Sequence, residues 1–236
     1  MRRALALPLL LLAGILGACG SSKDTKSDTG AATAPTPTSA QATQPAGNPP
    51  VGANGCQQVG APAPKPDGGA KKPKQPLDAS KTWTLDMRTS CGVFTVTLNL
   101  KTAPKASASM VSLARGGFFK NTIFHRIVPG FVIQGGDPTG SGQGGPGYST
   151  VDKPPRNAKY TKGVVAMAKT QAVAPGTAGS QFYVVTGADA GLPPDYAVIG
   201  KVTKGLATVE RIGALGDQNE QPTQPVVLYD VTATGS

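Results

Sequence analysis

The 236-residue chain is poor in the residue types on which most metal sites and hydrolytic sites depend. It contains a single histidine and three cysteines, and its carboxylates are not clustered. This scarcity excludes a zinc site and a Ser-His-Asp arrangement, because both need histidine beside other titratable groups. The Gly-Lys-Ser/Thr ending of a phosphate-binding loop is missing as well. We therefore expect no metal and no cofactor.

Large apolar side chains are almost missing from Ser21 to Ala79, where only Val51, Val59 and Leu77 are aliphatic or aromatic beyond alanine. Proline, alanine, threonine, serine, glycine and lysine fill most of that stretch. Such a composition cannot bury enough apolar surface to offset the entropy that is lost on ordering. We therefore predict a disordered tether over residues 19–80 and a folded domain over residues 81–236.

Dense runs of charge are also scarce, although the chain carries a net charge of +10. Lys71-Lys72-Pro73-Lys74 is the nearest approach to a basic run, and few aromatic residues lie among the basic ones. A nucleic-acid interface usually combines a basic stripe with a recognisable motif, so we exclude nucleic acid as a partner. A basic surface that faces anionic lipid or wall polymer is the simpler interpretation.

The apolar run at the N-terminus, Ala4–Gly17, is too short to span a bilayer comfortably. It follows Met1-Arg2-Arg3 and leads to Cys19, a pattern that resembles the processing site of bacterial lipoproteins. We predict a signal peptide over residues 1–18 and lipidation of Cys19, which would anchor the chain on the extracytoplasmic face of the cell membrane. An ordinary signal peptide that is cleaved near Ala18 is the alternative.

The two remaining cysteines, Cys56 and Cys91, form an even pair in a chain that we expect to be exported. Thiols in an oxidising compartment tend to pair, so we predict a disulfide between these two residues. The alternative is a free Cys56 on a disordered tail and a half-buried, unpaired Cys91.

The rest of the chain shows the patterns of short strands and two helices. Apolar and polar residues alternate on both sides of a turn at 89–92, which predicts a β-hairpin from Trp83 to Leu100. Pro104 predicts the start of one helix, and a second short helix is expected over Leu206–Leu215. Further strands are predicted over residues 123–128, 131–133, 164–168, 181–186, 197–202 and 225–234. Without a strand–helix–strand rhythm, this pattern favours a mainly β, antiparallel barrel.

The most informative stretch is Phe124–Gly147, in which two short apolar runs are followed by many glycines. The glycines at 140–145 fit a dinucleotide-binding pattern, but Pro146 prevents the helix that must follow. Taken alone, His125 is compatible with a core histidine and Arg126 with a structural ion pair. No nucleophile or general base stands out, and this favours chemistry in which no bond is cleaved.

Three motifs resemble the signatures of the cyclophilins, which are peptidyl-prolyl cis–trans isomerases: Phe124–Ile127, Phe131–Asp137 and Gly179–Tyr183. The resemblance extends from about Trp83 to the C-terminus. It implies a closed eight-stranded antiparallel β-barrel capped by two α-helices. It also implies proline-containing polypeptides as substrates, and we expect the chain to act as a monomer.

The resemblance assigns catalysis to Arg126, with Gln134 bracing the guanidinium. A guanidinium held at the prolyl nitrogen stabilises the twisted amide over the planar one, and this difference in binding accelerates rotation. His125 and Tyr196 are expected at the rim of a proline pocket, and the backbone of Lys169 beside the substrate. The substrate-binding residues implied by the resemblance are His125, Phe131, Val132, Lys169, Gln181, Tyr183, Leu192 and Tyr196.

The sequence departs from the common cyclophilin pattern at several pocket positions. Val132 stands in place of a methionine, Tyr183 in place of a phenylalanine, and Gly191 where many members have a tryptophan. The loop over residues 169–178 is longer than usual. Since Arg126 is retained, we expect an isomerase that acts on exported proteins. A peptide-binding or surface-interaction module with low turnover on the same barrel is the alternative.

Overall fold

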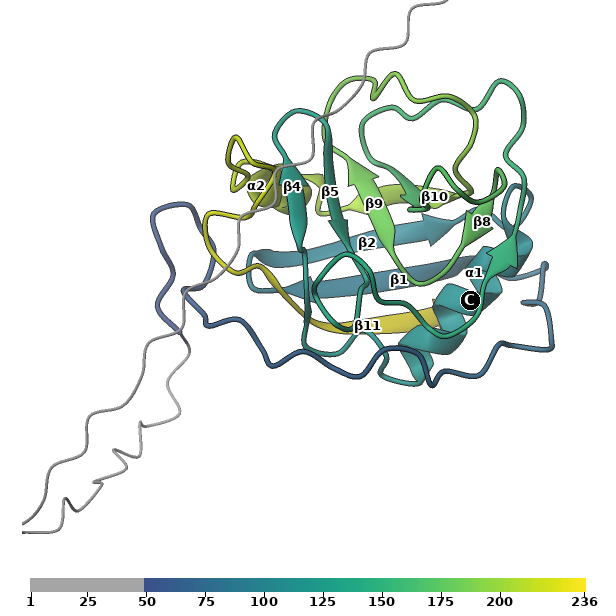
Figure 1. Cartoon of the computed structure of the whole chain (residues 1–236), viewed down its shortest axis with the longest axis horizontal. Helices are drawn as coiled ribbons and strands as arrows, with labels where there is room; N and C mark the ends of the chain where they lie inside the picture. The colour runs from purple at the N-terminus through teal and green to yellow at the C-terminus, as the bar shows by residue number, and fades with distance from the viewer. Residues whose placement is uncertain (1–48) are drawn as a thin grey trace, which may run out of the picture. The chain divides into compact units, whose positions relative to one another are not determined.

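The fold of residues 49–236, the part of the chain that the computed structural model describes, is built on a curled antiparallel β-sheet (Figure 1). The predicted signal peptide over residues 1–18, the lipidation site Cys19 and the tether residues 20–48 lie outside the described residues. Within the described part, no helix has both the length and the apolar character needed to cross a membrane.

The structure is mainly β with two helices, as the sequence predicts. The elements in chain order are β1 (Trp83–Thr89), β2 (Gly92–Leu98), α1 (Pro104–Arg115), β3 (Thr122–Ile123), β4 (Arg126–Val128), β5 (Val132–Gly135), β6 (Thr150–Val151), β7 (Val164–Met167), β8 (Thr177–Ala178), β9 (Phe182–Val185), β10 (Val198–Lys204), α2 (Leu206–Gly213) and β11 (Val227–Gly235). One nine-stranded sheet has the order β3-β11-β1-β2-β10-β7-β9-β5-β4, and β6 pairs separately with β8.

The sheet curls until both of its edges are formed by one stretch of chain, residues 122–128. The first half of this stretch, β3, pairs with β11 through Ile123 and Val227. The second half, β4, pairs with β5 at the other edge of the sheet. Counted as one interrupted strand, β3 and β4 reduce the nine strands to eight, so the arrangement is compatible with the predicted barrel.

The core lies inside the curl of the sheet and is formed by the alternating apolar residues of the hairpin. Leu85 and Met87 of β1 and Phe94 and Val96 of β2 are fully buried, while their sequence neighbours are more exposed. This alternation places one face of each strand on the core. The predicted hairpin is confirmed, with its turn at residues 90–91.

The two helices cover different parts of the sheet. Helix α1 begins at Pro104, whose missing N–H costs nothing in the first turn, and it packs against β11 through residues such as Met110. Helix α2 follows Gly205, whose φ of 74° is in the left-handed region, and it packs against β2 and β5. Both predicted helices are confirmed.

The N-terminal segment, residues 49–80, differs from its prediction as a disordered tether. It is ordered along the outside of the domain, where Figure 1 draws it in dark blue below β11. Backbone hydrogen bonds join Lys65 N–H to the Pro138 carbonyl over 2.9 Å and Gly68 N–H to the Gly145 carbonyl over 2.9 Å. The folded unit therefore begins before the predicted boundary at residue 81. Hydrogen bonds of its backbone and of side chains such as Lys72 hold this segment, and apolar composition does not reveal them.

The predicted disulfide between Cys56 and Cys91 is present and joins the N-terminal segment to the first hairpin turn. Both cysteines are buried, and the bridge rules out the alternative of two free thiols. Beside the bridge, Gln57 N–H donates to the Ser90 carbonyl over 2.7 Å. The bridge and this backbone bond hold the segment at its first contact with the sheet.

Candidate active site

Strands β4, β5 and β9 bring three functional side chains into one row. Arg126 is the cross-strand partner of Gln134, and Gln134 is the partner of Tyr183. Directly paired residues in antiparallel strands project from the same face of the sheet. The strand register therefore places the predicted catalytic pair together, although the two residues are eight positions apart in the sequence.

A pocket of about 300 Å³ opens beside this row. Loops after β7 and before β10 complete its walls. Its lining residues are Arg126, Phe131, Val132, Gln134, Ala168, Lys169, Tyr183, Leu192 and Tyr196. The structure thus gathers both predicted catalytic residues and six of the eight predicted substrate-binding residues around one cavity; His125 and Gln181 are the two that do not line it. Apolar and aromatic side chains make up most of this lining, which suits the ring of proline.

Gln134 belongs to a chain of side-chain hydrogen bonds. Its carbonyl lies 3.4 Å from Nη1 of Arg126, and its Nε2 donates to Oε1 of Gln181 over 3.0 Å. Nε2 of Gln181 in turn donates to the carbonyls of Gly142 and Gly144, each over 2.9 Å. Gln181 lines an adjoining hollow of about 220 Å³ that shares Gln134, Ala168 and Lys169 with the pocket. From there it fixes the amide orientation of Gln134 so that the Gln134 carbonyl faces the guanidinium.

The glycine-rich loop over residues 137–147 is organised by Asp137. The carboxylate of Asp137 accepts hydrogen bonds from Thr139, Gly142 and Gly144. Burial alone would raise the pKa of Asp137, but these hydrogen bonds outweigh it and hold the pKa below its usual range. Asp137 ends one of the recognised motifs, yet the sequence analysis gave it no role of its own.

Arg126 is held from a second side by Glu220, which the sequence analysis did not identify. Nε of Arg126 donates to Oε2 of Glu220 over 2.6 Å, and the two side chains are 32% and 49% exposed. Glu220 lies in the loop between α2 and β11, far from Arg126 in the sequence, and no sequence pattern marks it.

Lys169 lines the pocket, and its buried side chain pairs with Asp195. Its Nζ lies 2.6 Å from Oδ2 of Asp195, and the side chain is only 3% exposed. The ammonium also lies 5.5 Å from the centre of the Tyr196 ring. The predicted role of Lys169 concerned its backbone, and among the described residues that backbone makes no hydrogen bond to other main-chain groups. It is therefore open to pairing with an extended peptide.

Three tyrosines pack together at the pocket, where Tyr183 and Tyr196 line the cavity and Tyr160 lies outside the lining. The rings of Tyr183 and Tyr196 meet edge to face with centroids 5.7 Å apart, and Tyr160 packs against both. The Tyr160 hydroxyl donates to the Tyr196 carbonyl over 2.8 Å. Burial raises the pKa of Tyr183 far above its usual range, so its hydroxyl stays neutral. The cluster gives the pocket a rigid, uncharged wall.

His125, expected at the rim of the pocket, is not among its lining residues. It lies in the break between β3 and β4, directly before Arg126. The imidazole lies beside Gly142, and both of its ring nitrogens are buried without a hydrogen-bond partner. Burial lowers the pKa of His125, although the carboxylate of Asp137 partly offsets the shift. The side chain is therefore neutral and packs behind the site.

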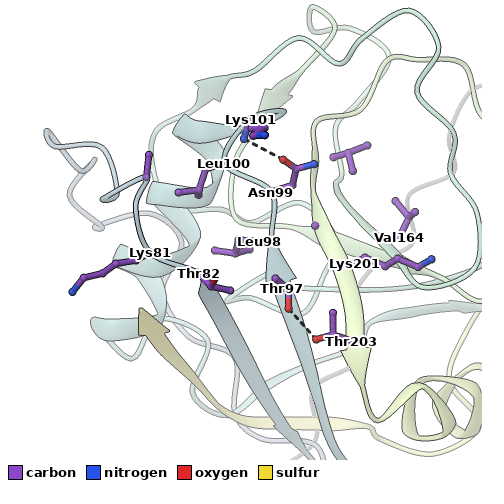
Figure 2. Close-up of a pocket in the computed structure, with 13 residues that line it drawn as sticks. Lys81, Thr82, Thr97, Leu98, Asn99, Leu100, Lys101, Val164, Lys201 and Thr203 are labelled. Atoms are coloured by element: carbon purple, nitrogen blue, oxygen red, sulfur yellow. Dashed lines mark hydrogen bonds between the residues drawn. The ribbon is translucent and has the colours of Figure 1, made fainter. Parts of the chain in front are cut away.

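A second, larger hollow of about 540 Å³ lies over β2 and β10 and contains none of the predicted site residues. Figure 2 shows its polar side chains, among which the Thr97 and Thr203 hydroxyls hydrogen-bond to each other over 2.9 Å. The ammonium groups of Lys81, Lys101 and Lys201 lie on different sides of the hollow and do not converge (Figure 2). Its lining contains no arginine, so no guanidinium faces this hollow.

The described residues contain no group of three or more histidine, cysteine, aspartate or glutamate side chains placed to hold a metal ion. The pocket offers the guanidinium of Arg126, which the Gln134 amide braces, beside apolar and aromatic side chains. A curled antiparallel sheet with such a pocket suits the class of proteins that bind a peptide at proline and act on it electrostatically.

Comparisons with known proteins agree with this class. Residues 84–233 match the family model of cyclophilin type peptidyl-prolyl cis-trans isomerases. Peptidyl-prolyl cis-trans isomerase A of Mycobacterium tuberculosis is 35% identical over 170 residues, which cover 64% of this chain and 92% of that protein. An isomerase of Arabidopsis thaliana is 34% identical over 147 residues, which cover 60% of this chain and 88% of that protein.

Solved structures show the same fold. The crystal structure of a cyclophilin type peptidyl-prolyl cis-trans isomerase of Cryptosporidium parvum superimposes with a TM-score of 0.60 and 31% identity. The match covers 66% of this chain and 99% of that one. The chain belongs to the cyclophilin-type peptidyl-prolyl cis-trans isomerase family.

Proposed function

We propose that this chain catalyses cis–trans isomerisation at X-Pro bonds of exported proteins, and that it does so as a monomer anchored to the outer face of the cell membrane. The observation that carries the catalytic part is the placement of Arg126 and Gln134 in one pocket with the apolar and aromatic side chains of Phe131, Val132, Tyr183 and Leu192. The same fold in the Cryptosporidium parvum isomerase has been crystallised in the presence of the dipeptide Ala-Pro, which supports proline as the recognised residue.

Catalysis in this proposal is electrostatic and breaks no bond. Rotation about an X-Pro bond is slow because amide resonance imposes a barrier of roughly 18–20 kcal/mol. In the twisted transition state the prolyl nitrogen becomes pyramidal and basic. Arg126, which is always protonated, donates to that nitrogen and so stabilises the twisted form more than the planar one. Gln134 keeps the guanidinium in the required orientation through Nη1.

Binding of the substrate uses the rest of the pocket. The proline ring enters between Phe131, Val132 and Leu192, and the neutral Tyr183 lies behind it. The backbone of the substrate runs beside Lys169 as an added strand, which keeps the chain extended on both sides of the rotating bond.

The location follows from the N-terminal pattern and from the disulfide. A basic start, a short apolar run and Cys19 support processing as a lipoprotein. The Cys56–Cys91 bridge supports export, because disulfides persist in oxidising compartments. Replacing Cys19 with alanine should release the protein from membranes or leave it as an unprocessed precursor. Mass spectrometry of the membrane form that finds Cys19 unmodified would contradict the anchor.

The catalytic proposal is tested with a protease-coupled assay on a short X-Pro peptide, using the full chain purified in mild detergent. We expect the cis-to-trans rate to rise in proportion to protein concentration. Saturable binding of the peptide, measured by calorimetry, without any increase in that rate would instead support a binding module with low turnover.

A further inference from the structure

Glu220 contacts one side of the Arg126 guanidinium, on which the proposed isomerase activity depends. Its carboxylate accepts from Nε of Arg126 over 2.6 Å, while Gln134 faces Nη1 over 3.4 Å. Within residues 49–236 no hydrogen bond involves Nη2 of Arg126. Two of the three guanidinium nitrogens are thus engaged by the protein, and the third is left for the substrate.

The loop that carries Glu220 is fixed to the same strand as Arg126. The Glu220 carbonyl accepts a hydrogen bond from the backbone N–H of Ile127 over 3.0 Å, so the loop covers the outer edge of β4. Asp217 holds the loop from within, because its carboxylate accepts from Asn219 N–H and Gln221 N–H, each over 2.8 Å. Backbone and side chain of Glu220 therefore contact adjacent residues of the strand.

The backbone of Glu220 adopts a conformation that disfavours this residue type. Its φ of 64° lies in the left-handed region, and Asn121 is the other non-glycine residue with positive φ in the described part of the chain. Asparagine tolerates this region better than glutamate does, and glycine best of all. A glutamate in a glycine conformation costs stability, and such strain is typical of positions with a functional role.

The ion pair itself adds little to folding. Both side chains are partly exposed, and pairs of this kind contribute little to the free energy of unfolding because water and salt screen them. Neither the backbone conformation of Glu220 nor its ion pair favours folding. The remaining benefit of a glutamate at this position is that its carboxylate orients the guanidinium of Arg126.

We propose that Glu220 is a positioning residue for the isomerase reaction: it fixes the rotation of the Arg126 side chain through Nε and directs Nη2 toward the prolyl nitrogen. The proposal rests on the proposed function of the pocket. Orientation matters most when the twisted amide is bound, so loss of Glu220 should lower kcat more than it raises KM.

The test compares Glu220→Gln and Glu220→Gly with the wild-type full chain. Both variants should lose about three- to tenfold in kcat/KM, with most of the loss in kcat. Glu220→Gly should at the same time unfold at the same temperature as the wild type or higher, because glycine fits the left-handed conformation. Lower activity without lower stability separates positioning from a structural role.

Glu210→Gln is the matched control. Glu210 pairs with Lys162 over 2.9 Å at similar exposure, 48% and 45%, and neither residue lines the pocket. This variant removes the same charge and should keep the wild-type kcat/KM. If it loses activity to the same extent as Glu220→Gln, a general change in charge explains the effect and the proposal is overturned.

A double-mutant cycle with Arg126→Ala completes the test. Glu220→Gln should have no further effect once Arg126 is removed, because its action runs through that side chain. An equal loss in both backgrounds, or a Glu220→Gln variant as active as the wild type or faster, would overturn the proposal. If the wild type itself has no activity, the proposed function fails and the cycle has no baseline, so the two failures are distinguishable.

Discussion

The pocket and the N-terminal segment are stabilised by separate sets of contacts. The pocket is held by an ion pair at Arg126, amide bonds at Gln134, and packed tyrosines. The N-terminal segment, residues 49–80, is held by the bridge at Cys56, by main-chain hydrogen bonds such as the one from Gly68 to Gly145, and by side-chain bonds such as the one from Nζ of Lys72 to the Ser149 carbonyl. The comparison indicates a division of roles, in which side chains of the pocket supply activity and the segment supplies stability.

The glycine-rich loop over residues 137–147 contacts both regions. The Gly145 carbonyl accepts a hydrogen bond from Gly68 N–H of the N-terminal segment. The Gly142 and Gly144 carbonyls accept hydrogen bonds from Gln181, which is bonded to Gln134 of the pocket. The division of roles is therefore testable in three places: in the segment, in the pocket, and in the loop that joins them.

The largest effect is expected from removing the disulfide with the double substitution Cys56→Ser and Cys91→Ser. The bridge spans 35 residues, and closing such a loop in the unfolded chain is worth about 3–4 kcal/mol in the entropy model. Because the segment is also ordered in the native state, urea unfolding should show most of this loss as a lower free energy of unfolding. The value of kcat/KM should change less than about twofold. Wild-type protein treated with reductant is the control and should behave alike. Unchanged stability would mean that the hydrogen bonds hold the segment without the bridge.

Arg126→Ala should lower activity and leave stability almost unchanged, the reverse of the pattern expected for the disulfide variant. Loss of a charge-assisted hydrogen bond of roughly 1.5–3 kcal/mol lowers kcat/KM by at least about tenfold. The free energy of unfolding should change by less than about 0.5 kcal/mol, since the side chain is partly exposed. Arg156→Ala, at an exposed position outside the pocket, is the control and should be fully active. Near-native activity of Arg126→Ala with intact circular dichroism would refute the mechanism.

Gln181→Ala should have an intermediate effect and should lower both kcat/KM and the free energy of unfolding. It removes the bond to Gln134 and the two bonds to the glycine-loop carbonyls. We expect kcat/KM to fall about three- to tenfold and the free energy of unfolding to fall by about 1 kcal/mol, as for the loss of ordinary hydrogen bonds. Gln75→Ala, at an exposed position in the N-terminal segment, should change neither. A variant that lost only stability would show that Gln134 orients itself without Gln181.

The smallest effect concerns pH and the only histidine. Burial lowers the pKa of His125 in the folded state, so the unfolded chain takes up a proton more readily. The stability from neutral His125 is present above its unfolded pKa of about 6.5 and is lost as pH falls below it. The loss over one pH unit is bounded by about 1.4 kcal/mol. His125→Gln should reduce the fall in unfolding temperature between pH 6.5 and 5.5; an unchanged pH profile would contradict the assignment.

The sequence predicts those parts of the molecule that depend on apolar periodicity or on a motif. Alternation from Trp83 to Leu98 identifies the hairpin, and Pro104 marks the start of α1. The motifs include Arg126 and Gln134, which the strand register then places opposite each other.

Features that depend on three-dimensional contacts escape such reasoning. The N-terminal segment has few apolar side chains, and the main-chain and side-chain hydrogen bonds that hold it leave no pattern in the sequence. Glu220 is an ordinary glutamate in a loop until the fold brings it to Arg126. His125 belongs to the motif, but it lies in the break between β3 and β4, and its imidazole packs beside Gly142 without lining the pocket.

The most direct test measures, by NMR exchange spectroscopy, the rate at which an X-Pro peptide interconverts in the presence of equal amounts of three proteins. These are the wild type, Arg126→Ala, and the variant without the Cys56–Cys91 bridge. The account predicts that the bridge variant matches the wild-type rate within about twofold, while Arg126→Ala falls at least about tenfold below it. Equal rates for wild type and Arg126→Ala, or an equal loss in both variants, would contradict it.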